Sequence, residues 1–178
     1  MAGQSTPATT ALNRCGVSYR LHTYRVDQRA HSYGAQRVFK TLVTQLDGQL
    51  VVAVVPVSAQ LDLRALAAVR GAKKAKMASA ADAERATGYV TGGIVALGHR
   101  KQLPVVIDVS VQHFETVFCS AGRRGLQTRT GSRRPGASDE SDRRADRLVS
   151  GIRCYNTVTH SRGVATPRLC VPVREGLP

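Results

Sequence analysis

The stretch RVFKTLVTQLDGQLVVAVVPVSAQLDL, from Arg37 to Leu63, decides the fold that we predict for this chain. It contains two apolar runs, one on each side of Asp47-Gly48. Asp-Gly readily takes the positive φ angles of a tight turn, so apolar runs around it are typical of a β-hairpin. We therefore expect the chain to be organised around a pair of antiparallel strands in this stretch.

The two strands of the predicted hairpin differ in their surroundings. The second, Leu50 to Val57, is an almost unbroken run of apolar residues, which predicts burial on both faces at the centre of a sheet or barrel. The first carries Lys40, which either points outward to water, as charged residues usually do, or is held inward against an anion. A strand beside a central one is well placed to line a cavity.

Composition favours one domain and a polyanionic partner. A chain of 178 residues is long enough for a single domain with a core of its own, and 42% of its residues are hydrophobic. Only 4% are aromatic and tryptophan is absent, so the core is expected to be aliphatic. Lys and Arg number 26 against 12 acidic residues, and the formal net charge of +14 favours a partner such as nucleic acid.

The four cysteines, Cys15, Cys119, Cys154 and Cys170, lie far apart and form no Cys-x-x-Cys pair. This spacing suggests neither a zinc ribbon nor a thioredoxin motif, and we expect no metal and no other cofactor. The N-terminus lacks the pattern of a signal peptide, and no apolar run approaches the length of a membrane span. We expect a soluble, cytoplasmic protein with reduced thiols and no membrane partner.

Caps and hydrophobic periodicity predict the remaining elements. Thr6 and Pro7 are the typical N-cap and first residue of a helix that Gly16 closes. The polar segment 27–36 is expected to be a loop. The other predicted elements are a strand at 17–24, a helix from Leu61-Asp62-Leu63 through Val69 with Gly71 as its C-cap, a helix at 79–87 that stops at Gly88, and strands at 103–109 and 116–120.

Two further motifs have both a structural and a functional interpretation. Lys73, Lys74 and Lys76 form a basic cluster, which is either a solvated face or a contact for a phosphate backbone. Residues 89–94, YVTGGI, form a glycine-rich bend. Its backbone can approach a ligand closely and donate N–H groups, or it simply turns the chain. Neither motif identifies an activity by itself.

The chain changes character at Gln127. Arg, Ser, Thr, Gly and Asp dominate from there on, lysine is absent, and large apolar residues are too few for a segment that folds alone. We therefore predict a folded domain at 6–126 and a disordered basic tail at 127–178. A reading-frame change in a GC-rich gene would also produce this arginine-rich ending, and it would truncate the domain at its C-terminal end.

Together these stretches resemble the YbaK/EbsC family of aminoacyl-tRNA deacylases, which is related to the editing domain of bacterial prolyl-tRNA synthetases. The resemblance covers Thr6 to about Leu126 and looks closest to the branch that deacylates Cys-tRNA(Pro). It implies an α+β fold with a barrel-like, largely antiparallel sheet flanked by helices. The motifs that carry it are Thr6-Pro7-Ala8, His22-Thr23-Tyr24, Val38-Phe39-Lys40-Thr41-Leu42, Val54-Val55-Pro56-Val57, Leu61-Asp62-Leu63, Gly71-Ala72-Lys73-Lys74, Thr87-Gly88-Tyr89, Gly92-Gly93-Ile94, Leu103-Pro104, Ile107-Asp108 and Ser120-Ala121-Gly122-Arg123-Arg124-Gly125-Leu126.

The resemblance implies how the tRNA would be held. Lys40 would contact the phosphate or ribose at the 3′ end of the acceptor strand, and it is the first candidate catalytic residue. Tyr24 and Thr41 would supply hydroxyl groups around the terminal adenosine and the aminoacyl ester. The lysine cluster would bind the tRNA backbone. Beside tRNA, prolyl-tRNA synthetase is a candidate protein partner.

The resemblance also implies how the ester would react. The backbone N–H groups of Gly92 and Gly93 would hold the carbonyl oxygen as negative charge develops on it, and Ser120 and Gly122 would complete the pocket wall. The sequence shows no nucleophile with its own base, which agrees with the substrate-assisted chemistry of the family. In that chemistry the thiol of the bound cysteine attacks its own ester, so the protein only positions and polarises the ester.

Three departures from the family pattern accompany the resemblance. The segment before Lys40 is short, the glycine bend lacks the usual Ser-Pro after Ile94, and Gln127 stands where relatives carry an aspartate. These departures leave a second interpretation open, in which the chain is a tRNA-binding homologue whose pocket has lost its editing activity.

Overall fold

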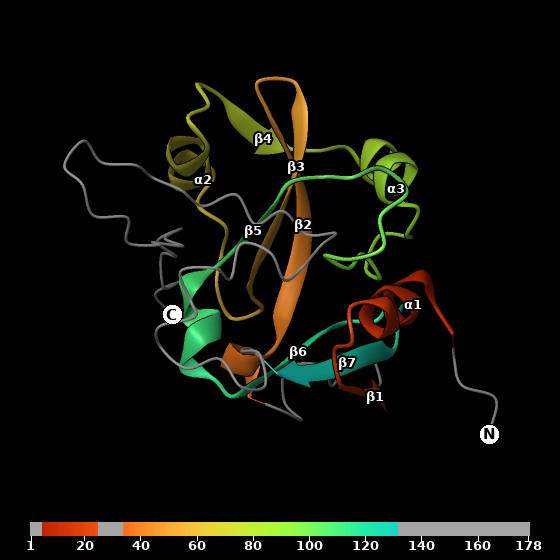
Figure 1. The fold of residues 1–178 in the computed structure, drawn as a ribbon. Helices are drawn as coiled ribbons and strands as arrows, with labels where there is room; N and C mark the ends of the chain where they lie inside the picture. The colour runs from red at the N-terminus through yellow and green to blue at the C-terminus, as the bar shows by residue number, and fades with distance from the viewer. Residues whose placement is uncertain (1–4, 25–33, 132–178) are drawn as a thin grey trace.

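The computed structural model describes residues 5–24 and 34–131 of the chain. Two small sheets meet in it, and helices pack around them (Figure 1). The expected α+β class with a mixed, largely antiparallel sheet is confirmed. In chain order the elements are α1 (Pro7–Arg14), β1 (Tyr19–Thr23), η2 (Ala35–Arg37), β2 (Phe39–Leu46), β3 (Gln49–Pro56), α2 (Leu63–Arg70), β4 (Ala75–Met77), α3 (Ala80–Thr87), β5 (Val105–Ile107), η3 (Val109–His113), β6 (Thr116–Ser120) and β7 (Leu126–Gly131).

The predicted hairpin is formed by β2 and β3, which pair antiparallel along their whole length. Its turn is Asp47-Gly48, with φ angles of 45° and 89°. β4 pairs with the end of β2 near the turn, and β5 runs parallel to β3, so the four-stranded sheet has the order β4-β2-β3-β5. β3 lies between two strands and is buried from Val51 to Pro56, as its apolar run predicts.

The second sheet has three antiparallel strands in the order β1-β7-β6. A parallel bridge between Val38 and Phe118 joins it to the start of β2. The expected end of the folded part at Leu126 is wrong, because β7 continues beyond it and both Gln127 and Thr128 are buried. Pairing with two neighbouring strands stabilises this polar segment, and local composition does not reveal such pairing. The rest of the predicted tail lies outside the described residues.

The first helix begins at the predicted cap Thr6, and α2 and α3 end at the predicted glycines, whereas the C-cap of α1 is Cys15, one residue before the predicted Gly16. The side chains of Thr6, Asp62 and Ser79 accept backbone N–H groups at the starts of α1, α2 and α3. Gly71 and Gly88 end α2 and α3 in the left-handed conformation, with φ angles of 64° and 78°. The expected loop before the hairpin ends in η2, and its earlier part lies outside the described residues.

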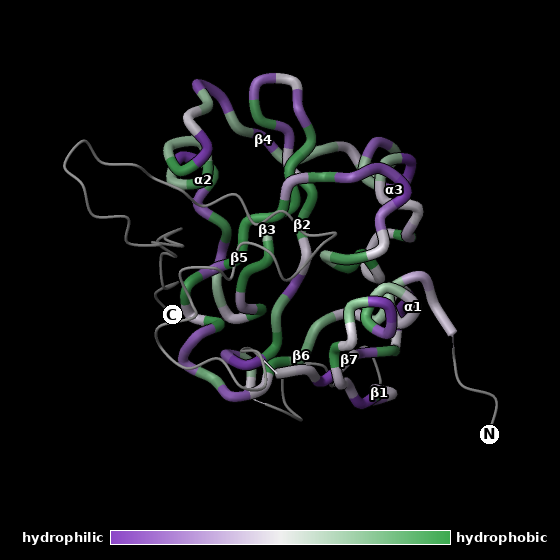
Figure 2. The backbone as a smooth tube through the Cα atoms, in the orientation of Figure 1, coloured by the Kyte–Doolittle hydropathy of each residue, from purple (hydrophilic) through white to green (hydrophobic). Residues whose placement is uncertain are grey.

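Apolar clusters pack on both faces of the four-stranded sheet, because side chains alternate between the faces along each strand. One cluster joins Phe39, Val43 and Val54 to the segment after α3. The other joins the opposite face to Leu66 of α2. The hydropathy colouring in Figure 2 shows this apolar character along β3 and β5. None of the helices within 5–24 and 34–131 combines the length and apolar character that crossing a bilayer requires.

Candidate active site

A cavity of about 290 Å³ lies between the two sheets. Its wall is formed by β2, by the connection from β4 into α3, by the glycine bend after α3 and by the end of β6. Lys40, Thr41, Gly92 and Ser120 all line it, although they are far apart in the sequence. The fold therefore brings four of the predicted site residues to one space.

The cavity lies at an edge of β2 that β4 does not cover. β4 pairs with β2 only from Thr44 to Leu46, and the last contact is the Ala78 N–H donating to the Val43 carbonyl oxygen at 3.0 Å. Successive residues of an antiparallel strand direct their backbone groups to alternate sides. Thr41 therefore presents its N–H and C=O on the same side as Val43, away from β3, so both its backbone and its hydroxyl belong to a polar part of the wall.

Lys40 is the only cation among the described residues that line the cavity. Its side chain is half-buried, and its Nζ lies 3.5 Å from the carbonyl oxygen of Val57. Burial removes water from the ammonium group and lowers the pKa of Lys40 below its ordinary value of 10.5. The side chain is thus neither in open solvent nor fully enclosed. Its position is intermediate between the two that the sequence allows, outward to water or inward against an anion.

The glycine bend does not offer both of its predicted donors. Residues Val90 to Gly93 form a tight turn, in which the Gly93 N–H donates to the Val90 carbonyl oxygen at 2.9 Å. A Cβ at Gly93 would lie 2.8 Å from the Cα of Arg123, so this glycine packs against a backbone and does not line the cavity. The expected role of the Gly93 N–H is therefore corrected, and Gly92 is the remaining candidate donor.

Ser120 lies on the cavity wall, whereas Gly122 and Tyr24 are not among the described residues that line it. A Cβ at Gly122 would meet Tyr89 at 3.1 Å and Thr6 at 3.2 Å. This glycine therefore lets the start of α1 pack behind the wall, which corrects its expected place in the pocket. Tyr24 directly follows β1, at the end of the first described segment, and its role at the ester stays a prediction.

Tyr89 supports the segment that follows the glycine bend. Its hydroxyl donates to the carbonyl oxygen of Leu97 at 2.8 Å. Burial raises the pKa of Tyr89 to about 12, so the hydroxyl keeps its proton at neutral pH and remains a donor. A Cβ at Gly98 would come within 2.8 Å of the same hydroxyl, which explains the glycine there.

The lysine cluster lies at the end of the molecule where the hairpin turns (Figure 1). The carboxylate of Asp47 in the turn accepts the backbone N–H groups of Lys73 and Lys74 at 2.8 and 2.9 Å. The turn therefore fixes the backbone of the cluster while the lysine side chains stay exposed. Lys76 lies on β4 next to Met77, which lines the cavity, so the cluster leads to the rim of the site.

The chemistry of the wall is that of positioning groups. The described residues that line the cavity include no histidine, cysteine or carboxylate. Neither Cys15 nor Cys119 forms a disulfide within the described part of the chain, and both lie outside this wall. No group of three or more His, Cys, Asp or Glu side chains in the described part of the chain could hold a metal ion.

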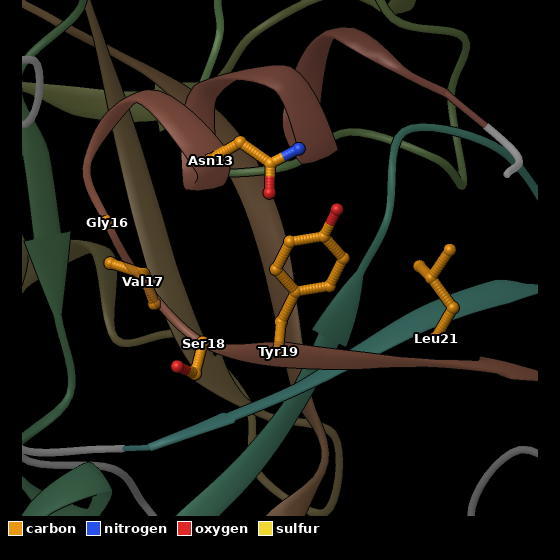
Figure 3. A pocket seen from close by; sticks show the side chains of 6 residues that line it. All are labelled: Asn13, Gly16, Val17, Ser18, Tyr19 and Leu21. Carbon is orange, nitrogen blue, oxygen red and sulfur yellow. The ribbon is translucent and has the colours of Figure 1, made fainter.

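A wider and more open hollow lies between α1 and β1 (Figure 3). It measures about 600 Å³, and Figure 3 shows Asn13 on the helix above Tyr19 and Leu21 on the strand. The six described residues around it carry no charged side chain. The smaller cavity is the better candidate, because it joins a cation, hydroxyl groups and exposed backbone.

Two charged residues next to the cavity hold Thr91 through hydrogen bonds that sequence patterns do not reveal. Glu84 Oε1 accepts the N–H of Thr91 at 2.7 Å and its hydroxyl at 2.8 Å. The Arg124 Nε donates to the Thr91 carbonyl oxygen at 2.9 Å. The backbone and side-chain hydrogen bonds from Thr91, with a smaller contribution from the Arg124 charge, lower the pKa of Glu84. In the sequence Glu84 looks like an ordinary surface charge, and Arg124 belongs to a family motif that gives it no role of its own. The contact with Thr91 distinguishes both residues.

Known proteins resemble this chain over most of the folded part. The family described as the aminoacyl-tRNA editing domain matches residues 22–133. The match continues past Gln127, where the resemblance was expected to stop. A protein of Enterococcus faecalis, provisionally named Cys-tRNA(Pro)/Cys-tRNA(Cys) deacylase EbsC, is 42% identical over 102 residues. The aligned region is 55% of this chain and 62% of that protein, so the chain spans less than two thirds of the relative's length.

Solved structures share the fold at low sequence identity. A crystal structure provisionally described as a trans-editing enzyme for prolyl-tRNA synthetase matches with a TM-score of 0.63 and 20% identity, over 71% of this chain and 87% of that chain. The crystal structure of hypothetical protein APE2540 matches with a TM-score of 0.68 and 17% identity, over 83% and 96% of the two chains. At these identities the likeness establishes the fold alone.

Proposed function

This chain belongs to the aminoacyl-tRNA editing domain family, and from that premise we propose that it removes the amino acid from mischarged tRNA in trans. The main substrate is Cys-tRNA(Pro), and Cys-tRNA(Cys) is the second, following the name of the Enterococcus faecalis relative. The reaction takes place in the cytoplasm, where tRNA is charged. Prolyl-tRNA synthetase is the protein partner to test beside tRNA.

The observation that carries this proposal is the single cavity that holds Lys40, Thr41, Gly92 and Ser120. Each residue supplies what an aminoacyl ester at the end of a polyanion needs. A cation attracts the terminal phosphate, hydroxyl groups hold the ribose and the amino acid, and a backbone N–H stabilises an oxyanion. The net charge of +14 favours the same polyanionic partner.

The proposed chemistry uses the thiol of the substrate. The thiol of the bound cysteine gives its proton to water, and the resulting thiolate attacks the carbonyl carbon of its own ester. The bond between that carbon and the ribose oxygen then breaks, the ribose oxygen takes a proton from water, and the cysteine leaves as a thiolactone. The absence of histidine, cysteine and carboxylate from the described wall supports a mechanism in which the protein contributes orientation and electrostatics.

Four protein groups take part in this step. Lys40 anchors the acceptor end, and its reduced hydration strengthens its attraction to a phosphate. The Gly92 N–H donates to the carbonyl oxygen as it becomes an oxyanion. The hydroxyls of Thr41 and Ser120 hold the ester in the orientation that the thiol needs.

The experiment that tests the proposal measures release of radiolabelled cysteine from Cys-tRNA(Pro), with a no-enzyme control and with tRNA binding measured in parallel. Release faster than the control supports an editing deacylase. Binding without release would contradict the proposal and identify the second interpretation, a tRNA-binding homologue without activity. Absence of both would remove tRNA as the partner.

A further inference from the structure

The peptide between Thr91 and Gly92 is the central unit of the tight turn that borders the cavity. The turn closes with the Gly93 N–H on the Val90 carbonyl oxygen, and the φ of 88° at Gly92 is typical of the third position of a type II turn. Type I and type II turns differ mainly in the direction of this central peptide, and glycine accepts the φ of either. The residues of the turn alone therefore leave the direction open.

Two side chains from other elements hold this peptide. Arg124, between β6 and β7, donates its Nε–H to the Thr91 carbonyl oxygen at 2.9 Å. Glu84 of α3 accepts the Thr91 N–H at 2.7 Å and the Thr91 hydroxyl at 2.8 Å. Thr91 is thereby held at its N–H, its hydroxyl and its carbonyl group. Two separate parts of the chain, α3 and the connection between β6 and β7, therefore converge on one residue of the turn.

The direction of the Thr91 carbonyl determines the direction of the Gly92 N–H. Both groups belong to one planar trans peptide, in which the C=O and the N–H point in opposite directions. With its carbonyl oxygen held by Arg124, the peptide directs the Gly92 N–H away from that arginine. A Cβ at Gly92 would meet the Arg124 Nε at 3.1 Å, so the arginine side chain covers one side of this glycine. Another side of Gly92 lines the cavity.

We infer that Arg124 and Glu84 are positioning residues that orient the Gly92 N–H toward the cavity. Neither side chain is among the described residues that line the cavity, so both act through Thr91. The catalytic consequence rests on the proposed function, in which this N–H stabilises the oxyanion of the ester. Without Arg124 the central peptide adopts both directions, and only a fraction of the molecules presents the donor.

The first part of the test measures orientation in the protein without substrate. In a type II turn the Thr91 Hα lies close to the Gly92 amide proton, so the nuclear Overhauser effect between them is strong, and it is weak in a type I turn. Arg124→Ala should weaken this effect, and Arg124→Lys, which keeps a donor, should restore part of it. The matched control is Arg123→Ala, which removes the same charge from the neighbouring exposed position. An unchanged effect in Arg124→Ala would overturn the inference.

The second part compares the same variants in single-turnover deacylation of Cys-tRNA(Pro). Loss of one oxyanion donor costs about 10²–10³ in rate, so a donor that is only partly misdirected in Arg124→Ala should cost about 10- to 100-fold. The Kd for tRNA should match that of Arg123→Ala, because both variants lose one charge. Equal rates in the two variants would mean that Arg124 acts only as a charge and would overturn its positioning role. If the unaltered protein releases no cysteine, the proposed function fails, while the orientation measurement still decides the role of Arg124.

Discussion

Lys40 and Ser120 line the same cavity although β2 and β6 belong to different sheets. The bridge between Val38 and Phe118 holds the two sheets together close to this point. The Arg37 guanidinium adds a hydrogen bond of 2.8 Å to the Thr116 hydroxyl. The distance between the cation and the opposite wall therefore depends on how the sheets dock, and no single element sets it.

Replacing Lys40 should remove most of the editing activity. Lys40→Ala loses the charge that anchors the acceptor end and the orientation of the ester, and we expect a fall in kcat/KM on the order of 100-fold. Lys101→Ala, which removes one charge from an exposed position outside the described cavity wall, is the control and should change kcat/KM by less than about threefold. Equal losses in both variants would show that Lys40 contributes only net charge.

The pKa of Lys40 predicts how tRNA binding changes at alkaline pH. Burial lowers this pKa below 10.5, so the ammonium group loses its proton at a lower pH than an ordinary lysine does. Affinity for uncharged tRNA should therefore start to fall before that pH is reached. Lys40→Arg keeps its charge throughout, so its affinity should stay level over the same range. A parallel fall in both proteins would assign the effect to other groups.

The proposed chemistry predicts a large difference between cysteine and serine esters. Ser-tRNA(Pro) is close in size to the cysteine ester but carries a hydroxyl in place of the readily ionised thiol. It should therefore bind to the site, yet react far more slowly. Single-turnover rates measured at matched occupancy separate binding from reaction. Comparable rates for the two esters would point to an activated water in place of the substrate thiol.

Alanine at Gly122 should destabilise the protein more than alanine at Gly48. Both glycines have positive φ angles, 95° and 89°, so both substitutions cost about 1 kcal/mol of backbone strain. A Cβ at Gly48 meets nothing within 4 Å, whereas one at Gly122 lies 3.1 Å from Tyr89 and 3.2 Å from Thr6. Crowding should therefore add about 1–3 kcal/mol at Gly122 alone, measured as the free energy of unfolding in urea. Equal losses of unfolding free energy in the two variants would mean that Tyr89 and Thr6 move aside without cost.

The lysine cluster should set part of the salt dependence of tRNA binding. The substitutions to test are Lys73→Ala, Lys74→Ala and Lys76→Ala. Each one that leaves a phosphate without its cation should reduce the slope of the logarithm of the binding constant against the logarithm of the salt concentration by about 0.7 to 0.9. Removal of residues 132–178 should flatten the slope further without changing amino-acid selectivity. This deletion starts after β7, since a cut at the predicted boundary would remove a paired strand. If none of these changes alters the slope, the tRNA contacts neither the lysine cluster nor residues 132–178.

Much of the fold could be predicted because the deciding interactions are local. The hairpin depends on Asp47-Gly48 between two apolar runs, and the helices depend on caps such as Thr6 and Gly71 that act within one turn of the chain. β7 could not be predicted, because its stability comes from pairing with β1 and β6 on both sides. A polar strand such as this one carries no hydrophobic signal, and the change in composition at Gln127 suggested disorder.

The sequence alone predicted which chemical groups to expect at the candidate site, since the family motifs include Lys40, Thr41, Gly92 and Ser120. Only the tertiary structure decided where these groups meet, at the edge of β2 that β4 leaves uncovered, because sheet pairing is a long-range property. It also decided which donor remains available, since the turn uses the Gly93 N–H. The physical reason is that a backbone group has the same chemistry everywhere in the chain, and its partner in the fold determines whether a ligand can reach it.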